Sequence, residues 1–336
     1  MSFSVRCERC DLEWCGTGLS GVFAQPSNLL RPSFHGMLLE IARFNREAPR
    51  LLDEPGAASL TLEAWLAREG YGAAFRRHYL IPMAAAVWSS GPAAMETFPA
   101  ETLVRFFRNH GFLGVTTQLR WRTVEGGSRE YVRLLTAPFR ERVHLETPVA
   151  KVRRDAHGVE LVFSDGGSRR FDGVVIAAHA DEALAMLEEP TADEKRLLGA
   201  WRYSRNETLL HSDASLLPRR AGARASWNYH LGDCAAPWTS ATLHYWINRL
   251  QGLPKETDWI VSLNPTREPA AGTVARRLLY THPVYTRESV ATQAELPTLN
   301  GRNRTWFAGA YFGYGFHEDG LSAGLAAAAA LGAEPQ

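Results

Sequence analysis

Residues 306–331, with the sequence WFAGAYFGYGFHEDGLSAGLAAAAAL, constrain the fold more than any other part of the chain. The apolar run TWFAG predicts a short buried strand, and the alanine-rich end predicts a helix. Glycines separate the two, and glycine lets a backbone approach another group closely. We expect Glu318 and Asp319 to cap the helix, with 321–324 as a first turn in which every residue but Leu321 is small.

A glycine turn followed by the start of a helix suits a flat, electron-rich ligand. The first turn of a helix presents unpaired N–H groups and a partial positive charge, which match the N1 and O2 edge of a reduced flavin. The helix dipole contributes only about 0.3–1 kcal/mol, so it tunes such a ring more than it binds it. The structural alternative is an alanine-rich helix that packs on a sheet behind a glycine loop.

A second glycine-rich stretch lies near the amino end. In CGTGLSG, Gly16, Gly18 and Gly21 match the G-x-G-x-x-G spacing of a dinucleotide-binding loop. That motif needs a buried strand before it and a helix within it, but the preceding strand is half polar and Pro26 would interrupt the helix. Glu40, at the distance of a ribose-binding acid, falls within the next predicted helix. We therefore interpret the stretch as the exit of a hairpin, with a nicotinamide-dependent reductase as a rival function.

The composition excludes several classes of partner. Among 336 residues, 37 Lys and Arg balance 36 Asp and Glu, and a formal charge of +1 attracts neither nucleic acid nor an anionic membrane. No run reaches roughly 18 apolar residues, and no signal-peptide pattern begins the sequence. We therefore expect no nucleic-acid partner, no transmembrane segment and a cytoplasmic location.

The cysteines do not predict a metal site. Cys7 and Cys10 form a lone C-x-x-C, Cys15 lies nearby, and Cys234 is far along the chain. A zinc site needs a fourth ligand at a matching spacing, and the sequence shows none. We expect reduced, incidental thiols on a hairpin and no bound metal.

The chain changes character along its length, which predicts two interleaved domains. Residues 1–120 have the pattern of a hairpin and a helical layer, including a helix over 32–47, and residues 201–300 are rich in strand patterns. We assign both segments to one substrate domain. Residues 121–200 and 301–336 alternate strands with helices, as a dinucleotide-binding domain does.

Short strands dominate the middle of the chain. The predicted strands are VHLET, VAKVRRD, VELVFSDGG and RRFDGVVIAA. The run 174–178 is apolar on both faces, as in a buried parallel strand, and the helix ADEALAML follows it directly.

Taken in chain order, four of these features resemble the flavin-containing amine oxidoreductase superfamily, which includes monoamine oxidases, protoporphyrinogen oxidases and phytoene desaturases. They are GGSREY, ETPVAKVRRDAHGVELVFSDGG, DGVVIAAHADEALAML and the terminal FAGAYFGYGFHEDGLSAGLAAA. The resemblance covers nearly the whole chain and is strongest to bacterial proteins predicted to bind NAD or FAD. It implies an α/β fold, in which an incomplete FAD-binding Rossmann-like domain is interleaved with an α+β substrate domain.

The resemblance also implies which residues hold FAD. Val149 stands where backbone groups meet the adenine, and 309–323 wraps the ribityl chain and the flavin. The expected cofactor-binding residues are Gly126, Gly127, Val149, Gly309, Ala310, Tyr311, Gly313, His317, Glu318, Gly320, Leu321, Ser322 and Ala323. His317 is a candidate proton relay, with helix capping as its structural alternative, and Asn248 is a second catalytic candidate.

Two departures from the family bear on activity. The strand, G-x-G-x-x-G turn and helix that receive the FAD pyrophosphate have no counterpart here, which predicts a truncated reading frame. Several amine-oxidising relatives keep a lysine near flavin N5, and the only lysines here are Lys151, Lys195 and Lys255. None is an obvious candidate, which argues against amine substrates.

These features together predict an FAD-dependent oxidoreductase that transfers hydride from a substrate C–H bond to flavin N5. We expect this activity to be impaired, because the pyrophosphate-binding loop is missing. The helical layer 28–112, rich in Phe, Leu and Trp, can line an apolar tunnel for a small apolar or lipid-like substrate. The structural alternative is that these residues only pack against one another. The alternative is a non-catalytic fragment or partner-binding protein that does not hold FAD.

Overall fold

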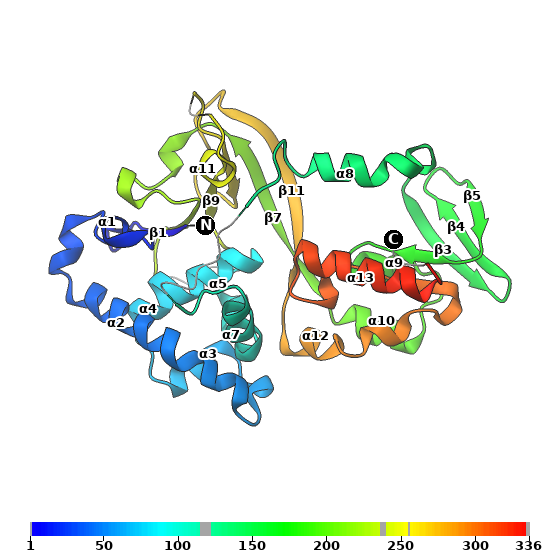
Figure 1. Ribbon diagram of the computed structural model, residues 1–336, viewed down its shortest axis with the longest axis horizontal. Helices are drawn as coiled ribbons and strands as arrows, with labels where there is room; N and C mark the ends of the chain where they lie inside the picture. The colour runs from blue at the N-terminus through cyan, green and yellow to red at the C-terminus, as the bar shows by residue number, and fades with distance from the viewer. Residues whose placement is uncertain (1, 115–121, 236–239, 255, 334–336) are drawn as a thin grey trace. The chain divides into compact units, whose positions relative to one another are not determined.

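The computed structural model describes residues 2–114, 122–235, 240–254 and 256–333, and these form two compact units. Unit 1 consists of Met1–Thr123 and Ser204–Arg287, and unit 2 consists of Val124–Tyr203 and Glu288–Gln336. The chain therefore passes between the units three times. Figure 1 follows it from β1 in blue to α13 in red. The predicted α/β class is confirmed, because both units combine helices with sheets.

Unit 1 is built on a seven-stranded mixed sheet in the order β11-β7-β10-β9-β8-β1-β2. Its strands are β1 (Phe3–Cys7), β2 (Leu12–Cys15), β7 (Arg202–His211), β8 (Trp227–Leu231), β9 (Leu243–Trp246), β10 (Ile260–Leu263) and β11 (Val274–Val284). The hairpin β1–β2 is antiparallel, as predicted, while β1 pairs in parallel with β8. This parallel pair places the amino-terminal hairpin beside a segment more than 200 residues away in sequence.

A layer of helices accompanies this sheet in unit 1 (Figure 1). The helices are α1 (Gly18–Val22), α2 (Pro32–Glu47), α3 (Leu62–Arg68), α4 (Ala73–Phe75), α5 (Ile81–Trp88), α6 (Pro92–Glu96), α7 (Ala100–Asn109) and α11 (Ile247–Gln251). The prediction of a helix over 32–47 is confirmed. Phe44, which is fully buried, contacts the rings of Phe75 and Phe107, so aromatic packing joins α2 to its neighbours.

Helices α4 and α5 are continuous through a π-helical turn, Arg76–Leu80. Pro82 has no N–H group, so it cannot donate the usual helical hydrogen bond to the carbonyl of His78. The indole Nε1 of Trp14 donates to that carbonyl instead, at 3.2 Å. A side chain of β2 thereby fixes the helix at its π-helical turn.

Unit 2 contains a three-stranded antiparallel sheet, β3-β4-β5, and a parallel pair, β12-β6. Its elements are α8 (Arg129–Thr136), β3 (Val149–Asp155), β4 (Gly158–Phe163), β5 (Ser168–Phe171), β6 (Val174–Ile176), α9 (Ala180–Met186), α10 (Ala192–Gly199), α12 (Arg287–Thr292), β12 (Thr305–Phe307) and α13 (His317–Ala330). The predicted strand VHLET, residues 143–147, is wrong, because the chain has no regular structure there.

The prediction that 174–178 is buried on both faces is also wrong. Strand β6 pairs in parallel with β12, as expected, but Val175 is 39% exposed. On α8, no residue is buried, although Leu134 and Leu135 are apolar. Within the described part of unit 2, no other element covers Val175, Leu134 or Leu135. The apolar sequence of β6, which predicted a buried strand, therefore lies partly at the surface.

The structure around CGTGLSG differs from two of the expectations that argued against a nucleotide-binding loop. All four residues of β2 are buried, and a five-residue helix, α1, does open within the glycine stretch. The topology still differs from a dinucleotide-binding unit, because β2 is an antiparallel edge strand. Pro26 begins a separate 3-10 turn, Pro26–Leu30, after α1 has ended.

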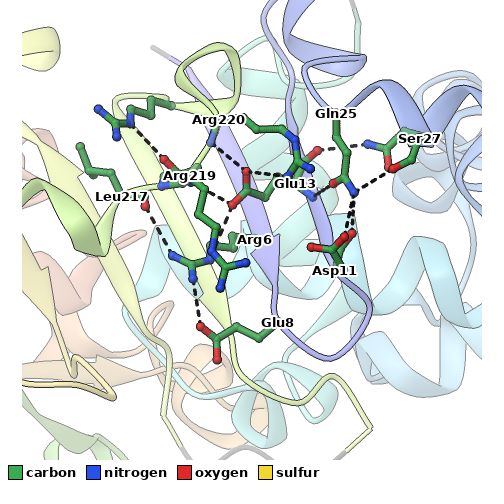
Figure 2. Close-up of polar contacts among 12 residues, drawn as sticks. Arg6, Glu8, Asp11, Glu13, Gln25, Ser27, Leu217, Arg219 and Arg220 are labelled. Atoms are coloured by element: carbon green, nitrogen blue, oxygen red, sulfur yellow. Dashed lines mark hydrogen bonds and ion pairs between the residues drawn. The ribbon is translucent and has the colours of Figure 1, made fainter.

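Glu13 is buried in β2 and its carboxylate is fully engaged (Figure 2). Its two oxygens accept hydrogen bonds from the backbone N–H groups of Arg219 and Arg220, at 2.9 and 3.0 Å. The guanidinium groups of Arg220 and Arg6 lie 3.3 and 3.7 Å from the same carboxylate. Because charged groups, backbone donors and a fixed geometry coincide, the carboxylate is stable in a buried position.

The side-chain amides of Gln25 and Asn28 hydrogen-bond to the backbone of β2. The Glu13 N–H donates to Oε1 of Gln25 at 2.7 Å, and Nδ2 of Asn28 donates to the Glu13 carbonyl at 3.1 Å. Gln25 also donates to the carbonyl of Asp11 at 2.7 Å (Figure 2). An edge strand that would otherwise expose its backbone is therefore closed by side chains.

We predict that Glu13→Ala lowers the free energy of unfolding by about 3–5 kcal/mol, because buried guanidinium and N–H groups lose their acceptor. Glu13→Gln should cost about 1–3 kcal/mol, since an amide N–H₂ would face a backbone donor. Glu8→Gln is the matched control, because Glu8 is 47% exposed and its loss should cost less than about 1 kcal/mol. Urea denaturation compares the three variants, and equal stability of Glu13→Gln and the parent protein would contradict this account.

Candidate functional site

Unit 1 encloses an apolar cavity of about 490 Å³ beside the amino-terminal hairpin. Its walls come from the hairpin and α1, from one face of α2, and from the π-helical turn and α5. The lining residues include Phe3, Trp14, Gly16, Leu38, Ile41, Tyr79, Met83, Val87 and Trp227. The glycine stretch CGTGLSG contributes Gly16, Thr17, Gly18 and Leu19 to this wall. The stretch therefore shapes an apolar cavity, a role that its sequence did not indicate.

The cavity wall carries few polar groups. None of its lining residues is Asp, Glu, Lys, Arg or His, as far as the described residues go. The side-chain oxygen of Asn45 is buried there and has no hydrogen-bond partner within the described structure. A ligand that enters thus meets a mostly apolar wall. In the described structure, the Asn45 oxygen can accept a hydrogen bond there, and the unpartnered indole N–H of Trp227 can donate one. An ammonium group buried here would find no opposite charge, which is unfavourable.

In unit 2, strand β12 leads into the glycine loop and then into α13. The helix packs on β12 through Ala323 and Ala327, which form a small buried cluster with Ala308. The prediction that α13 begins at Leu321 is wrong, because the helix begins at His317. Its first turn is thus polar, and the run of small residues lies one turn further on.

Asp319 caps α13 from within its first turn. Its Oδ2 accepts a hydrogen bond from the N–H of Phe316 at 2.9 Å, while Glu318 points to solvent. The carboxylate lies against Gly313, where any Cβ would overlap it. Gly313 is therefore needed for close packing, since its φ of −137° is open to any residue.

Gln293 holds the same loop from outside and was not identified from sequence. Its Nε2 donates to the carbonyls of Tyr311 and Gly313, at 3.1 and 2.5 Å. Tyr311 is buried, its hydroxyl has no partner in the described structure, and burial raises its pKa. No pattern in the sequence links Gln293 to a loop that begins 16 residues later.

One face of α13 is open at its glycines. A Cβ at Gly324 would meet nothing within 4 Å, and one at Gly320 would only reach the N atom of Ala310 at 4.0 Å. Leu321 and Leu325 beside them are 55% and 61% exposed. An apolar, small-residue helix face behind a rigid glycine loop fits a planar aromatic ring such as isoalloxazine. Ser322 is also exposed, but helical geometry places it on the opposite side of α13 from Gly320 and Gly324.

The remaining predicted cofactor residues lie in unit 2 as well. Gly126 and Gly127 have φ of 80° and 86°, a conformation that favours glycine, and form the exposed turn before α8. Val149 is the first residue of β3 and is half-buried. Ala310 is half-buried in the short turn Ala310–Phe312, which follows Gly309.

The two predicted catalytic residues have different environments. His317 is exposed at the first position of α13. Asn248 is buried in unit 1, and its amide donates to the carbonyls of Pro254 and Thr257 while its Oδ1 accepts from the N–H of Trp259. Both N–H groups of Asn248 are thereby used to brace a loop, so this geometry supports a structural role for it.

Neither of the two described lysines belongs to unit 1, which holds the cavity. Lys151 lies on β3 in unit 2 and pairs with Glu188 at 3.4 Å. Lys195 is exposed on α10, and Lys255 lies outside the described residues.

The prediction that Cys7 and Cys10 have no further potential metal ligands is wrong, because the fold brings two distant residues to them. Cys234 and His78 meet them in unit 1, and the ligand atoms of the four side chains all lie within 4.8 Å of one another. Burial raises the pKa of the Cys7 thiol to about 12 and lowers the pKa of His78 to about 4. Cys15 lies apart from this group and contacts the hydroxyl of Thr17.

Among the described residues, no helix combines the length and apolar character needed to cross a lipid bilayer.

Comparison with known proteins gives one family and a common fold. The family model described as flavin containing amine oxidoreductase matches residues 24–205, which is more than half of the chain. A search of the curated proteins finds no match.

Solved structures share the fold at low sequence identity. Cyclohexylamine oxidase from Brevibacterium oxydans IH-35A is 16% identical, with a TM-score of 0.63 over 98% of this chain and 80% of that one. Putrescine oxidase bound to putrescine is 12% identical, with a TM-score of 0.63 over 98% and 80%. A CLA-producing fatty acid isomerase from P. acnes is 12% identical, with a TM-score of 0.57 over 97% and 79%.

We predict that Gly313→Ala loosens the loop ahead of α13, because the new methyl group displaces the capping carboxylate of Asp319. The expected cost is about 1–3 kcal/mol. Gly324→Ala is the control in the same helix, where free space and better helix propensity should leave stability unchanged or raise it by up to about 1 kcal/mol. Hydrogen exchange of peptides from 309–330 measures both, and equal protection in the two variants would refute the packing argument.

Proposed function

The chain belongs to the family of flavin-containing amine oxidoreductases, whose members bind FAD, and from this premise we propose that it oxidises a C–H bond of an apolar, uncharged substrate. The observation that carries this proposal is the cavity of unit 1, which has an apolar wall and no charged lining residue. FAD, when bound, supplies the acceptor for the hydride that leaves the substrate carbon.

The residues of unit 2 that we propose to hold FAD are those around the glycine loop. Gln293 and Asp319 fix the loop from two sides, so Gly309 and Gly313 need no rearrangement on binding. The open face at Gly320 and Gly324 would accept the ring. His317 is proposed as the proton relay, since it stands exposed at the start of the same helix.

The residues of unit 1 would bind and orient the substrate. An apolar wall excludes water and binds hydrocarbon at about 25 cal/mol per Å² of buried surface. The Asn45 side-chain oxygen would accept a hydrogen bond from a hydroxyl or neutral N–H of the substrate. An acyl chain fits this chemistry better than a diamine, since the wall offers no carboxylate to an ammonium group. A lipid-like substrate is thus favoured over an amine.

We also propose that residues 1–336 bind FAD weakly. Their one G-x-G-x-x-G stretch, CGTGLSG, does not lie between a buried parallel strand and a helix. Among the described residues of unit 2, the parallel sheet consists of β12 and β6 alone, whereas a complete dinucleotide-binding sheet has several parallel strands. The exposed apolar residues of α8 and β6 mark surface that a complete dinucleotide-binding domain would bury. We further propose a cytoplasmic location for the protein.

FAD titration tests the cofactor proposal. Three missing hydrogen bonds to pyrophosphate and ribose, at roughly 1.5–3 kcal/mol each, amount to about 6 kcal/mol, or about four decades in Kd. We expect this loss for residues 1–336 relative to a version extended at its amino end by a strand–GxGxxG–helix segment. Flavin fluorescence gives both constants. Tight binding by residues 1–336 contradicts the weak-binding proposal, and a colourless extended protein supports the alternative of a non-catalytic fragment.

The cavity proposal is tested with a fluorescent long-chain alcohol, which is an uncharged apolar probe. Ile41→Trp should fill the cavity and weaken binding at least about tenfold, which corresponds to 1.4 kcal/mol. Leu39→Trp is the matched control, because Leu39 is on the same helix but is 73% exposed and not part of the cavity wall. Equal binding by both variants would show that the probe binds elsewhere, and turnover of putrescine in place of apolar compounds would overturn the substrate class.

A further inference from the structure

Four potential metal ligands converge at the tip of the amino-terminal hairpin, outside the apolar cavity. They are the Sγ atoms of Cys7, Cys10 and Cys234 and a ring nitrogen of His78, and all lie within 4.8 Å of one another. Sγ of Cys10 and Sγ of Cys234 are 3.2 Å apart. A tetrahedral zinc site with Zn–S bonds of about 2.3 Å has ligand-to-ligand edges of about 3.8 Å. The four atoms are therefore near enough to one another to bind a single ion after small side-chain shifts.

The backbone brings these ligands together from three distant segments. Strand β1 pairs in parallel with β8, and Glu8 and Arg9 continue the pairing by donating to the carbonyls of Leu231 and Gly232, at 2.8 and 3.1 Å. This pairing carries the chain to Cys234 just beyond the hairpin tip. The tip itself has the C-x-x-C spacing of a zinc-binding turn, with the Cys10 N–H donating to the sulfur of Cys7.

His78 enters the group from the π-helical turn, which is a local irregularity of a kind often found at functional sites. Its backbone is fixed by the bond from Trp14 to its carbonyl. Its Nε2 is buried and has no hydrogen-bond partner within the described structure. A buried imidazole nitrogen without a partner is unfavourable, and a metal ion would satisfy it.

The surroundings suit a charged cluster. Arg9 forms an ion pair with Asp233 at 2.7 Å, which braces the hairpin tip against the segment that carries Cys234. Arg31 donates to the carbonyl of Cys10 at 3.1 Å. A cavity of about 440 Å³ is lined by Cys10, Cys234 and His78, and also by Arg77, so an ion has a path to the site.

We propose that Cys7, Cys10, Cys234 and His78 form a structural zinc site. Three thiolates and a neutral imidazole fill the tetrahedral coordination of Zn²⁺, which leaves no open position for substrate. Binding of Zn²⁺ forms three Zn–S bonds and one Zn–N bond and releases three thiol protons to solvent. The site then carries a net charge of −1, and Arg31 and Arg77 line the adjoining cavity, where their positive charges favour it. Soft sulfur ligands favour Zn²⁺ over Mg²⁺ or Ca²⁺.

The position of the site indicates what the ion does. It would cross-link the hairpin, the π-helical turn and the segment after β8, which are otherwise joined by hydrogen bonds and packing. Trp14 and Tyr79, neighbours of the cross-link, both line the apolar cavity. The ion would thus hold one wall of that cavity in place, whether or not the proposed oxidoreductase function is correct.

Metal content and Co²⁺ spectra of the whole protein test the proposal. We expect one zinc per chain by elemental analysis after purification without chelators. Replacement by Co²⁺ should give intense visible bands of a tetrahedral ion and a sulfur-to-cobalt charge-transfer band that reports the thiolates. These measurements use the parent protein, so they do not depend on the folding of any variant.

Variants identify the ligands. Cys10→Ser and Cys234→Ser should lower zinc affinity at least about 100-fold, or about 2.7 kcal/mol. His78→Cys should keep the metal with an altered Co²⁺ spectrum, while His78→Ala should weaken binding. Cys15→Ser is the matched control, because Cys15 is a buried free cysteine of the same hairpin outside the cluster. It should retain full zinc content and the parent spectrum.

Three results would overturn the proposal. One is a parent protein that holds no stoichiometric zinc and gives no tetrahedral Co²⁺ spectrum. Another is equal loss of metal in Cys15→Ser and Cys10→Ser. A third is a stable disulfide between Cys10 and Cys234, detected by mass spectrometry of the unreduced protein as prepared, with no metal bound. A protein that holds zinc but binds no FAD would contradict the proposed function and leave the zinc proposal standing.

Discussion

The buried carboxylate of Glu13 is the interaction on which unit 1 depends. It ties the edge strand β2 to the backbone of Arg219 and Arg220, far along the chain, and β2 in turn carries Trp14. Trp14 lines the apolar cavity and holds the carbonyl of His78. Because one strand serves the cavity and the four-ligand cluster together, the position of this strand sets the geometry of both. A buried charge without these donors would be strongly destabilising.

Unit 2 shows a different balance. Its glycine loop is held rigidly by Gln293 and Asp319, while α8, β6 and one face of α13 leave apolar side chains exposed. Rigid loops beside open apolar surface are expected where a ligand or a further chain segment completes a fold. The family membership gives the ligand, FAD, and we propose that its ring lies on the open face of α13.

Much of this could be predicted from the sequence, where local patterns control structure. The period of apolar residues placed α2, and the glycine spacing placed the loop before α13. The wrong predictions concern segments whose structure depends on contacts with residues far away in the sequence. VHLET has strand propensity but pairs with no strand in the described structure. The apolar run around Val175 predicted a buried strand, but no described element packs over Val175. The start of α13 shifted by a turn, because Asp319 caps from within the helix.

The sequence by itself determined the fold class, the likeness to a flavoprotein family and the glycine loop, since these rest on periodicity and on motifs within short windows. Only the tertiary structure decided that CGTGLSG lines a cavity, that Gln293 holds a loop, and that Cys234 and His78 join Cys7 and Cys10. The physical reason is strand pairing. The register of β1 against β8 brings residues more than 200 positions apart into contact, and no local pattern records it.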